Sequence, residues 1–204
     1  MKTLRECWDE IGQRTDKGPV CHSYLPFYEE VLGPYRETAS ALLEIGAFHG
    51  ASLDMWRLFF RPECHIWGVD FNPHILPDQV AAYEDANIHV LLRVDAYTPH
   101  TIRLLVDWLR NFGLQGFDVI IDDGSHIEEH QEFVLHEYGK LLNPGGLLVI
   151  EDVQPSPPNG HPDLPGNLIA TMEEVDYEFE RVELVDRRNE PPCRYDDLLV
   201  VVRR

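Results

Sequence analysis

The sequence is short of basic residues. It contains 17 lysines and arginines against 36 aspartates and glutamates, which gives a formal net charge of −19 at pH 7. A surface of this sign repels polyanions, so we do not expect DNA or RNA as a partner. The acidic balance favours binding of a cation, either a metal ion or a positively charged cofactor. The simpler alternative is that most of these carboxylates form a solvated face that keeps the protein in solution.

Long apolar runs, a signal-like N-terminus and paired cysteine motifs are also missing. No apolar stretch approaches the length needed to cross a bilayer, so we expect no membrane association. The four cysteines are scattered without a Cys-x-x-Cys pair, which is typical of reduced thiols in a cytoplasmic protein. With 204 residues, 44% of them apolar, and no internal repeat, the chain is expected to form one globular domain, residues 1–204.

The stretch from Phe117 to Val153 carries the strongest pattern. Two apolar runs of strand length, 117–121 and 147–150, are separated by a helix-period segment, 127–142, and a turn, 143–146. This order predicts a βαβ unit with neighbouring parallel strands. Polar residues follow both strands, at the edge where open α/β sheets bind ligands. Five side chains are therefore expected to meet in one cleft: Asp122, Asp123, His126, Glu151 and Asp152.

The rest of the chain shows the same alternation of apolar runs and helical patterns. Helices are predicted at 4–14, 26–32, 51–60, 78–85, 98–112 and 167–175, and further strands at 41–45, 65–69, 88–94, 177–185 and 198–202. The first five strands alternate with helices, and the last two form a C-terminal antiparallel hairpin. The predicted fold class is α/β, a Rossmann-like doubly wound sheet of seven strands with one antiparallel strand.

Two regions flank this predicted sheet. The helices of residues 1–36 precede the first strand, and we expect them to lie across the ligand-binding cleft or on one sheet face. Residues 153–166 contain five prolines and leave the active edge of the sheet, as is typical of a lid or substrate loop. A plain connector is the alternative.

The turn after the first strand has features of a nucleotide site. Gly46 and Gly50 let the backbone approach a ligand, and a helix N-terminus follows. Asp70 ends the next strand, where it can accept hydrogen bonds from ribose hydroxyls, and Asp95 could reach an adenine amino group. The two glycines lack the spacing of a dinucleotide turn, and Glu44 suits an amino-acid ammonium better than a pyrophosphate. The pattern favours S-adenosylmethionine over NAD, and a tight turn without a ligand is the alternative.

Three carboxylates after the two central strands form a candidate metal site. Asp123, Glu151 and Asp152 follow neighbouring strands about 4.8 Å apart, so their side chains can share one cation. A set of oxygen ligands without cysteine favours Mg²⁺ over Zn²⁺. The alternative to a metal site is that these acids cap helices or are solvent-exposed residues at the strand ends.

His126 is the best candidate for a general base, because an imidazole is partly neutral at physiological pH and can take a hydroxyl proton. Ser125 and Glu128 have the spacing of a capping box that starts the next helix. This motif predicts that His126 lies in the first helical turn, beside the strand end that bears Asp123.

Six short motifs occur together between about residues 12 and 153. They are Thr15-Asp16-Lys17-Gly18, His22-Ser23-Tyr24, Leu43-Glu44-Ile45-Gly46, Val69-Asp70, Ile121-Asp122-Asp123-Gly124-Ser125-His126 and Ile150-Glu151-Asp152-Val153. In combination they resemble the class I S-adenosylmethionine-dependent methyltransferases. More narrowly, they resemble the metal-dependent macrolide sugar O-methyltransferases.

The resemblance implies transfer of a methyl group from S-adenosyl-L-methionine to a hydroxyl of a small molecule, a sugar or vicinal diol of a secondary metabolite. It implies Mg²⁺ at Asp123, Glu151 and Asp152, with His126 as catalytic base. It also implies a cofactor site lined by Thr15, Glu44, Gly46, Asp70, Asp95 and Asp122, of which Thr15 rests on the resemblance alone. Well-known members carry a large N-terminal domain that contributes to the oligomer and the acceptor pocket. The acceptor and a homo-oligomeric assembly are therefore left open.

Other functions remain compatible with the same pattern. Catechol-type O-methyltransferases set similar acids at these strand ends, but they have Lys and Asn where this sequence has His126 and Asp152. A non-catalytic cofactor-binding protein and an oxidative enzyme of the same fold are the further alternatives. In the favoured interpretation the partner is a hydroxylated small-molecule acceptor.

Overall fold

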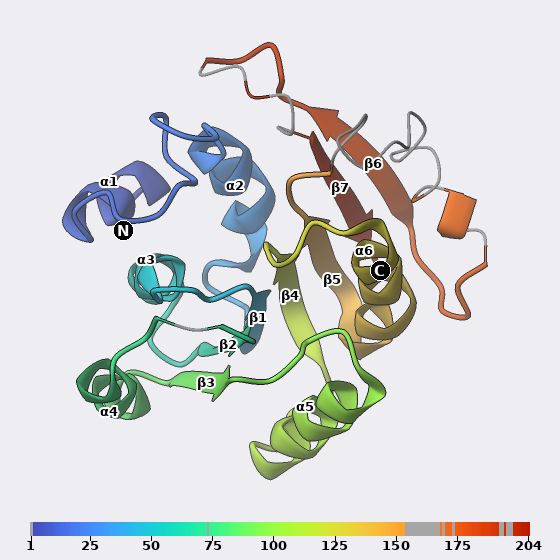
Figure 1. Cartoon of the computed structure of the whole chain (residues 1–204), viewed down its shortest axis with the longest axis horizontal. Coiled ribbons are helices and arrows are strands. Elements are labelled where there is room, and N and C mark those ends of the chain that lie inside the picture. Colours follow the sequence, from blue (N-terminus) through green and yellow to red (C-terminus); the bar gives the residue numbers. More distant parts are fainter. Residues whose placement is uncertain are drawn as a thin grey trace.

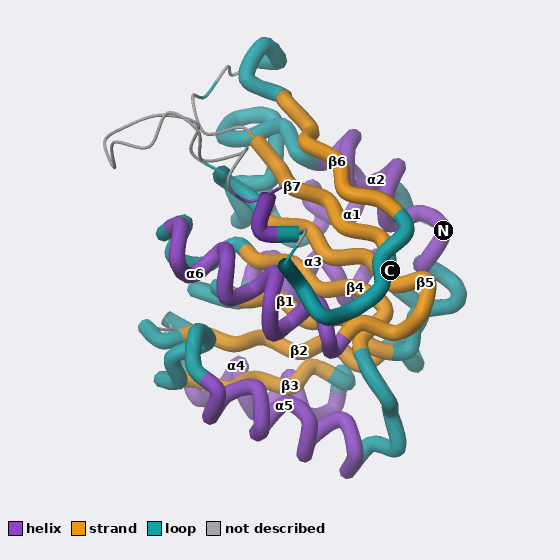
Figure 2. The backbone as a smooth tube through the Cα atoms, turned by 90° about the vertical axis from the view of Figure 1, so that its right-hand side faces the viewer, coloured by secondary structure: helices purple, strands orange, loops and turns teal. Residues whose placement is uncertain are grey.

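The computed structural model describes residues 2–72, 74–153, 168, 170–172, 174–191, 194 and 198–204. In these residues seven strands form one sheet (Figures 1 and 2). The strands are β1 (Ala41–Ile45), β2 (His65–Asp70), β3 (Ile88–Leu92), β4 (Phe117–Asp122), β5 (Leu142–Ile150), β6 (Arg181–Asp186) and β7 (Leu198–Arg203). The α-helices are α1 (Leu4–Glu10), α2 (Leu25–Leu32), α3 (Ala51–Phe59), α4 (Pro77–Asp85), α5 (Pro99–Asn111) and α6 (Glu128–Phe133).

The sheet has the order β3-β2-β1-β4-β5-β7-β6. Strands β1 to β5 pair in parallel, and β7 is antiparallel to both β5 and β6. The predicted doubly wound sheet with one antiparallel strand is confirmed. The order reverses between β1 and β4, and this switch point is where such sheets bind ligands.

Helices cover both faces of the sheet (Figure 1). Residues of α1 to α4 form one buried apolar cluster with side chains from one face of the strands, such as Leu42. Residues of α5, α6 and the turns after it form a second cluster on the opposite face with neighbours such as Leu43. Every residue of β1 is buried, as expected for a central parallel strand covered on both sides.

The segment predicted as one helix, 127–142, is divided into three pieces. Helix α6 is followed by a π-helical turn, Val134–Tyr138, and a 3₁₀ turn, Gly139–Leu141. A contact from a distant residue accompanies the break: the phenol of Tyr177 donates a hydrogen bond of 2.9 Å to the carbonyl of Leu135. The same ring occupies the space that a Cβ on Gly139 would need. The prediction of a single α-helix is therefore wrong. The spacing of apolar residues along the sequence contains no information about a contact with a distant residue.

Some other predicted boundaries also differ. The N-terminal helix ends at Glu10 and not at residue 14, because Gly12 and Gln13 have left-handed backbone conformations. Strand β5 begins at Leu142, and the ladder then jumps to Leu147, so the Asn-Pro-Gly-Gly stretch loops out of the pairing with β4. Strand β3 ends two residues earlier than predicted, and β6 begins at Arg181 instead of residue 177.

Several expectations concern residues that the structure describes only in part. The predicted substrate loop, 153–166, lies outside the described residues except for Val153, and so does part of the predicted helix 167–175. Three of the four cysteines are described, and Cys7, Cys21 and Cys64 are free thiols. Among the described residues, no helix combines the length and apolarity needed to span a bilayer.

Candidate active site

The turns that follow β1 and β4 touch at the switch point. Ile45 pairs with Asp122, and the backbone amide of Asp123 donates a hydrogen bond of 2.9 Å to the carbonyl of Ile45. Gly46 has a φ of +91°, and a Cβ at this position would lie 1.9 Å from the carbonyl oxygen of Asp123. Only glycine permits both this conformation and this approach, so Gly46 fixes the spacing of the two turns.

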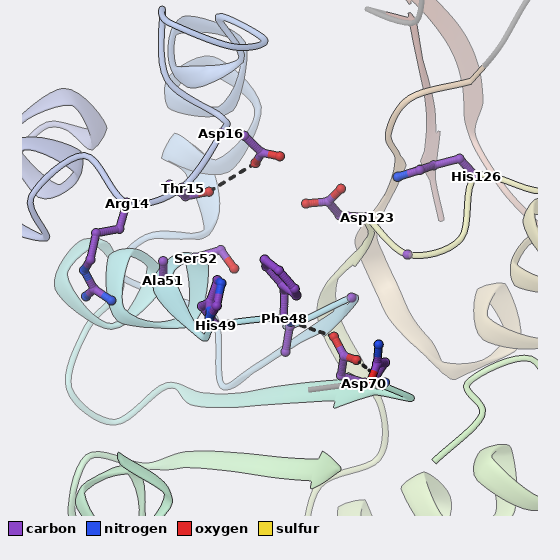
Figure 3. Close-up of a pocket in the computed structure, with 14 residues that line it drawn as sticks. Arg14, Thr15, Asp16, Phe48, His49, Ala51, Ser52, Asp70, Asp123 and His126 are labelled. Carbon is purple, nitrogen blue, oxygen red and sulfur yellow. Dashed lines mark hydrogen bonds between the residues drawn. The ribbon is translucent and has the colours of Figure 1, made fainter. Parts of the chain in front are cut away.

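Two adjoining cavities open at these turns. The larger one, about 450 Å³, lies between the segment Arg14–Asp16 and the turn that carries Asp123 and His126 (Figure 3). The smaller one, about 210 Å³, extends toward the segment Asp95–Tyr97. The residues that line both cavities are Gly46, Asp70, Asn72 and Gly124. One elongated ligand can therefore extend through both, and their sizes suit a nucleotide-like cofactor.

Asp70 lies at the junction of the two cavities. Its carboxylate accepts a hydrogen bond of 2.6 Å from the amide of Phe48 and one of 2.7 Å from the amide of Asn72. Asp95 is held in a similar way, by a hydrogen bond of 3.0 Å from the amide of Tyr97. Backbone donors thus hold in place the two acids that were predicted to contact ribose and adenine.

The remaining predicted cofactor residues divide into two groups. Thr15 lines the larger cavity and Gly46 lines both. Glu44 and Asp122 line neither cavity and are buried. Glu44 accepts a hydrogen bond of 2.6 Å from the hydroxyl of Ser52, and burial raises the pKa of its carboxyl to about 7. Burial likewise raises the pKa of Asp122 to about 7.

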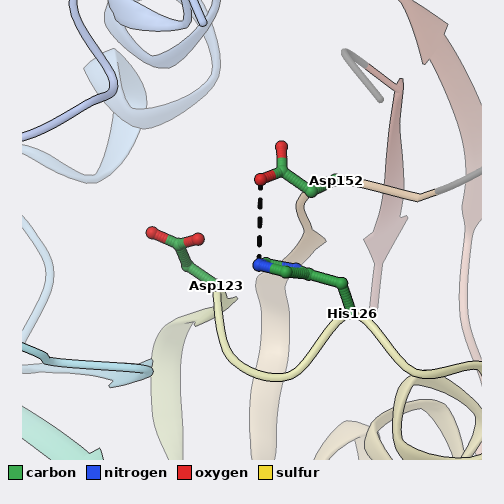
Figure 4. Close-up of side chains that lie close together, drawn as sticks. All are labelled: Asp123, His126 and Asp152. Atoms are coloured by element: carbon green, nitrogen blue, oxygen red, sulfur yellow. Dashed lines mark ion pairs between the residues drawn. The ribbon is translucent and has the colours of Figure 1, made fainter. Parts of the chain in front are cut away.

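The structure brings Asp123, His126 and Asp152 together as a candidate cation site (Figure 4). One ligand atom from each lies within 4.8 Å of the others, and Nε2 of His126 is 3.8 Å from Oδ2 of Asp152. His126 and Asp152 both have φ values above +50°, which non-glycine residues adopt at a cost. Burial and the like charge of Asp123 raise the pKa of Asp152 to about 6.

The predicted capping box does not form. Helix α6 begins at Glu128, Ile127 is its N-cap, and no side chain makes the cap hydrogen bond. The hydroxyl of Ser125 instead pairs with Nδ1 of His130 at 2.6 Å. His126 therefore precedes the helix, in a turn where its backbone is left-handed, and is not in the first helical turn. This turn carries the imidazole toward Asp152.

Glu151 has contacts that the sequence did not indicate. Its Oε1 atom lies 2.8 Å from Nζ of Lys17 and accepts a hydrogen bond from the phenol of Tyr28. Burial and the charges of Asp123 and Asp152 raise the pKa of Glu151, while the ammonium opposes them. The neighbouring Asp152 accepts a hydrogen bond of 2.6 Å from the phenol of Tyr24.

Residues from the N-terminal region thus complete the acidic site, and sequence reasoning missed three of them: Lys17, Tyr24 and Tyr28. Lys17 is fully buried and its Nζ lies 2.5 Å from Oδ2 of Asp123, although the two residues are 106 positions apart. Burial alone would lower the pKa of Lys17, but the surrounding carboxylates outweigh it and raise this pKa well above its ordinary value. The Thr15–Gly18 and His22–Tyr24 motifs marked the segment, but no local pattern identifies contacts over this separation.

The acidic residues of this site are suited to bind a hard divalent cation and to lie near a positively charged cofactor. Asp123 and Asp152 supply carboxylate oxygens, the ligands that Mg²⁺ prefers, whereas the imidazole of His126 is a poor ligand for it. Oε1 of Glu44, beneath the turn after β1, is buried and accepts no hydrogen bond from the described residues. A carboxylate at this depth favours positive charge nearby, and the ammonium of Lys17, 3.6 Å from this oxygen, already supplies one such charge.

Comparison with known proteins agrees with this geometry. A family model described as a methyltransferase domain matches residues 43–153, more than half of the chain. The chain belongs to this methyltransferase-domain family. The matched region begins within β1 and ends just after the acid pair Glu151–Asp152, so it includes the switch point and the candidate cation site.

Individual relatives narrow the comparison. The chain is 34% identical over 142 residues to the 8-demethyl-8-alpha-L-rhamnosyl tetracenomycin-C 2'-O-methyltransferase of Streptomyces olivaceus, a match that covers 66% of this chain and 34% of that protein. It is 31% identical over 153 residues to the mycinamicin VI 2''-O-methyltransferase of Micromonospora griseorubida, covering 71% of this chain and 35% of that protein. The resemblance to macrolide sugar O-methyltransferases is confirmed.

A solved structure shows the same arrangement of elements. The MycE methyltransferase of the mycinamycin biosynthetic pathway, in complex with Mg, SAH and mycinamycin VI, superposes with a TM-score of 0.73 and 26% identity. The alignment covers 98% of this chain and 54% of that one. The chain spans about a third of the length of the curated relatives it matches.

Proposed function

We propose that the protein is a Mg²⁺-dependent O-methyltransferase that uses S-adenosyl-L-methionine and acts on a hydroxyl of a small secondary metabolite, on a sugar or other vicinal diol. The observation that carries this proposal is that Asp123 and His126 line a cavity that Asp70 also lines, and that Asp152 lies close to both of them. The relatives named as sugar O-methyltransferases, and the similar chain solved with Mg and SAH, support it.

In this proposal the cofactor extends through both cavities. Asp70, already fixed by two backbone amides, accepts hydrogen bonds from the ribose hydroxyls. Asp95 lies beside the adenine in the smaller cavity, and Thr15 and Gly46 line the wall near the methionine part. Glu44 and Asp122 lie beneath this wall. They stabilise it by accepting hydrogen bonds from the hydroxyls of Ser52 and Tyr97, which line the cavities.

We assign the divalent cation to Asp123 and Asp152, with Glu151 as the third carboxylate. The contacts of Lys17 and Tyr28 with Glu151 both use Oε1, so the proposal places Oε2 toward the cation. When bound, the cation would supply positive charge that lowers the pKa of an adjacent acceptor hydroxyl. Held by these carboxylates, the charge would lie where two adjacent hydroxyls of the acceptor can approach it, which is why the proposal names a vicinal diol.

His126 is the proposed general base. Its Nε2 atom takes the proton of the reacting hydroxyl, and Oδ2 of Asp152, 3.8 Å away, stabilises the resulting imidazolium. The acceptor oxygen forms its bond to the methyl carbon while the carbon–sulfur bond breaks and its electron pair stays on sulfur. General base catalysis of this kind contributes roughly 10²–10⁴-fold, and alignment of the reacting atoms contributes much of the rest.

The proposal also includes a cytoplasmic location, consistent with the free thiols of the described cysteines, and a hydroxylated small molecule as the partner instead of nucleic acid. The −19 formal charge disfavours a polyanionic substrate. A homo-oligomer is compatible with this function.

Methyl transfer to a matched set of acceptors tests the proposal. The full chain is incubated with S-adenosylmethionine that carries an isotopically labelled methyl group, Mg²⁺, and either a rhamnoside, its 2-deoxy and 3-deoxy counterparts, or catechol. We expect label on the rhamnoside, much less on either deoxy sugar, and none after EDTA treatment. Transfer to catechol alone would indicate a catechol-type enzyme. Cofactor binding without transfer to any acceptor would contradict the proposal.

A further inference from the structure

The side chain of Lys17 lies among three carboxylates from three different strand ends. Its Nζ atom is 2.5 Å from Oδ2 of Asp123, 2.8 Å from Oε1 of Glu151 and 3.6 Å from Oε1 of Glu44. The lysine side chain is fully buried, as is that of Glu44. A single ammonium thus contacts the strand end beneath the cofactor cavity and both strand ends of the proposed cation site.

The backbone around Lys17 is held firmly in position. Its carbonyl accepts hydrogen bonds from the amides of Tyr24 (2.9 Å) and Leu25 (3.2 Å). Gly18 packs directly against Trp8, where a Cβ would lie 2.2 Å from a ring carbon. The indole of Trp8 donates a hydrogen bond of 3.0 Å to the carbonyl of Thr15. Contacts with α1 and with the start of α2 therefore fix the backbone from which the lysine side chain reaches the acids.

We propose that Lys17 is a positioning residue that holds the acids of the cation site in place before the divalent ion binds, and that it ties the segment Arg14–Asp16 to this site. The inference rests on the proposed metal-dependent function, because that function assigns the acids to a divalent cation. It goes beyond that function by assigning a role to a lysine that touches neither a ligand-binding cavity nor the reacting atoms.

The charges explain why such a residue is needed. Asp123 and Glu151 are brought together by neighbouring strands, and like charges repel strongly where water is excluded. The ammonium binds one oxygen of each, Oδ2 and Oε1, and leaves the other oxygen for a cation. Oε1 of Glu44 accepts no hydrogen bond from the described residues, and the ammonium of Lys17, 3.6 Å away, forms an ion pair with it.

Thermal unfolding in EDTA is the first test, and it needs neither cofactor nor acceptor. Lys17→Met keeps a long unbranched side chain and removes the charge, which leaves buried carboxylates uncompensated. We expect its Tm to fall by about 10 °C relative to the wild type. The matched control is Lys140→Met, which removes an ammonium that faces Glu137 and Asp176 on the surface, and which should change Tm by about 2 °C or less.

A second substitution separates charge from packing. In Lys17→Met/Glu151→Gln one carboxylate is neutralised together with the ammonium, so we expect at least half of the lost Tm to return. If Lys17→Met does not fold, the double variant should still fold. A Lys17→Met protein that melts within about 2 °C of the wild type, or a double variant that is no more stable than the single one, would overturn the proposal.

Titration with Mg²⁺ distinguishes positioning from a merely structural role. Because the ion can replace the missing positive charge, saturating Mg²⁺ should raise the Tm of Lys17→Met more than that of the wild type or of Lys140→Met. An equal rise in all three proteins would assign Lys17 to packing alone and contradict the proposal. If Mg²⁺ stabilises none of them, the proposed metal dependence fails, while the EDTA measurements still decide the role of Lys17 in holding the acids.

Discussion

The phenol of Tyr24 donates a hydrogen bond of 2.6 Å to Oδ1 of Asp152, although the two residues are 128 positions apart in the chain. Tyr24 is fully buried, and it immediately precedes α2. Asp152 has a left-handed backbone conformation just after β5. The N-terminal region thus orients the carboxylate that, in our proposal, binds the divalent ion and faces the catalytic imidazole.

The first prediction concerns this hydrogen bond. Tyr24→Phe removes the hydroxyl that holds Oδ1 of Asp152 and leaves this oxygen, among the described residues, with the longer contact of 3.6 Å to Nδ1 of His22, so we expect divalent-ion affinity to fall by about 10-fold or more. Mn²⁺ binding, followed by electron paramagnetic resonance, measures it. The control is Tyr35→Phe, whose hydroxyl binds the carbonyl of Gly145 away from the site and whose loss should leave Mn²⁺ affinity unchanged. Equal affinities for the two variants would refute the role of Tyr24.

The second prediction separates a base from a metal ligand. His126→Ala should lower kcat by about 10²–10⁴-fold, because the acceptor hydroxyl loses its proton acceptor. Its Mn²⁺ dissociation constant should change by less than about threefold, since the ion is assigned to carboxylates. His100→Ala, at an exposed position in α5, is the control for both measurements. A large loss of Mn²⁺ affinity in His126→Ala would instead make the imidazole a ligand.

The third prediction tests the contact between the two turns. Gly46→Ala places a Cβ 1.9 Å from the carbonyl oxygen of Asp123, so the turn must move. Gly113→Ala has a comparable φ, +71° against +91°, but its Cβ meets no atom within 4 Å. Denaturant unfolding should show a loss of about 1 kcal/mol for Gly113→Ala and at least twice that for Gly46→Ala. Only Gly46→Ala should lose affinity for S-adenosylhomocysteine in calorimetry. Similar losses in the two variants would mean that the turn contact is unimportant.

The fourth prediction concerns pH and a histidine pair far from the site. Nδ1 of His65 lies 3.0 Å from Nε2 of His89, on the neighbouring strands β2 and β3. Burial, with a smaller effect of His65, lowers the pKa of His89 to about 4. The unfolded chain binds a proton below about pH 6.5, and the folded chain does not until about pH 4. The contribution of His89 to the stability of the wild type should therefore fall as pH decreases through this window, whatever the buried carboxyls of the active site contribute.

Replacing His89 removes this dependence. Between pH 7 and pH 4.5, the unfolding free energy of His89→Gln should change by about 1 kcal/mol in the stabilising direction relative to that of the wild type, a figure that allows for partial exposure of the ring. Urea unfolding followed by tryptophan fluorescence measures the difference. His100→Gln is the control and should behave as the wild type does. A His89→Gln variant with an unchanged pH dependence would show that the pair does not set it.

Much of the fold was predictable because its strands are buried on both faces. The five residues of β1, Ala41–Ile45, form a continuous apolar run apart from Glu44, and the strand has the predicted bounds. Helix α5 has Pro99 at its first position and an apolar stripe, and it was also placed correctly to within one residue at each end. The acids after β4 and β5 follow from the same logic, since parallel strands end at one edge.

The parts that could not be predicted depend on specific side-chain contacts, most of them between distant residues. The local spacing of Ser125 and Glu128 satisfies a capping box, but a hydrogen bond to His130 takes the serine hydroxyl. The ammonium of Lys17 reaches Asp123 across 106 positions, and periodicity carries no information over that separation. The break in the helix after α6 is accompanied by a contact with Tyr177, which belongs to a later segment of the chain. The capping box is thus displaced by a contact five positions away, whereas the other two features involve contacts between distant segments of the chain.

The central claim is that a divalent ion binds between the carboxylates, next to an imidazole that is not one of its ligands. The most direct measurement is anomalous diffraction from crystals grown with Mn²⁺ and S-adenosylhomocysteine. The account predicts one strong peak within about 2.5 Å of carboxylate oxygens of Asp123 and Asp152, with Nε2 of His126 nearby but not bonded to the ion. A peak bonded to His126, a peak at another place, or no peak under saturating Mn²⁺ would contradict it.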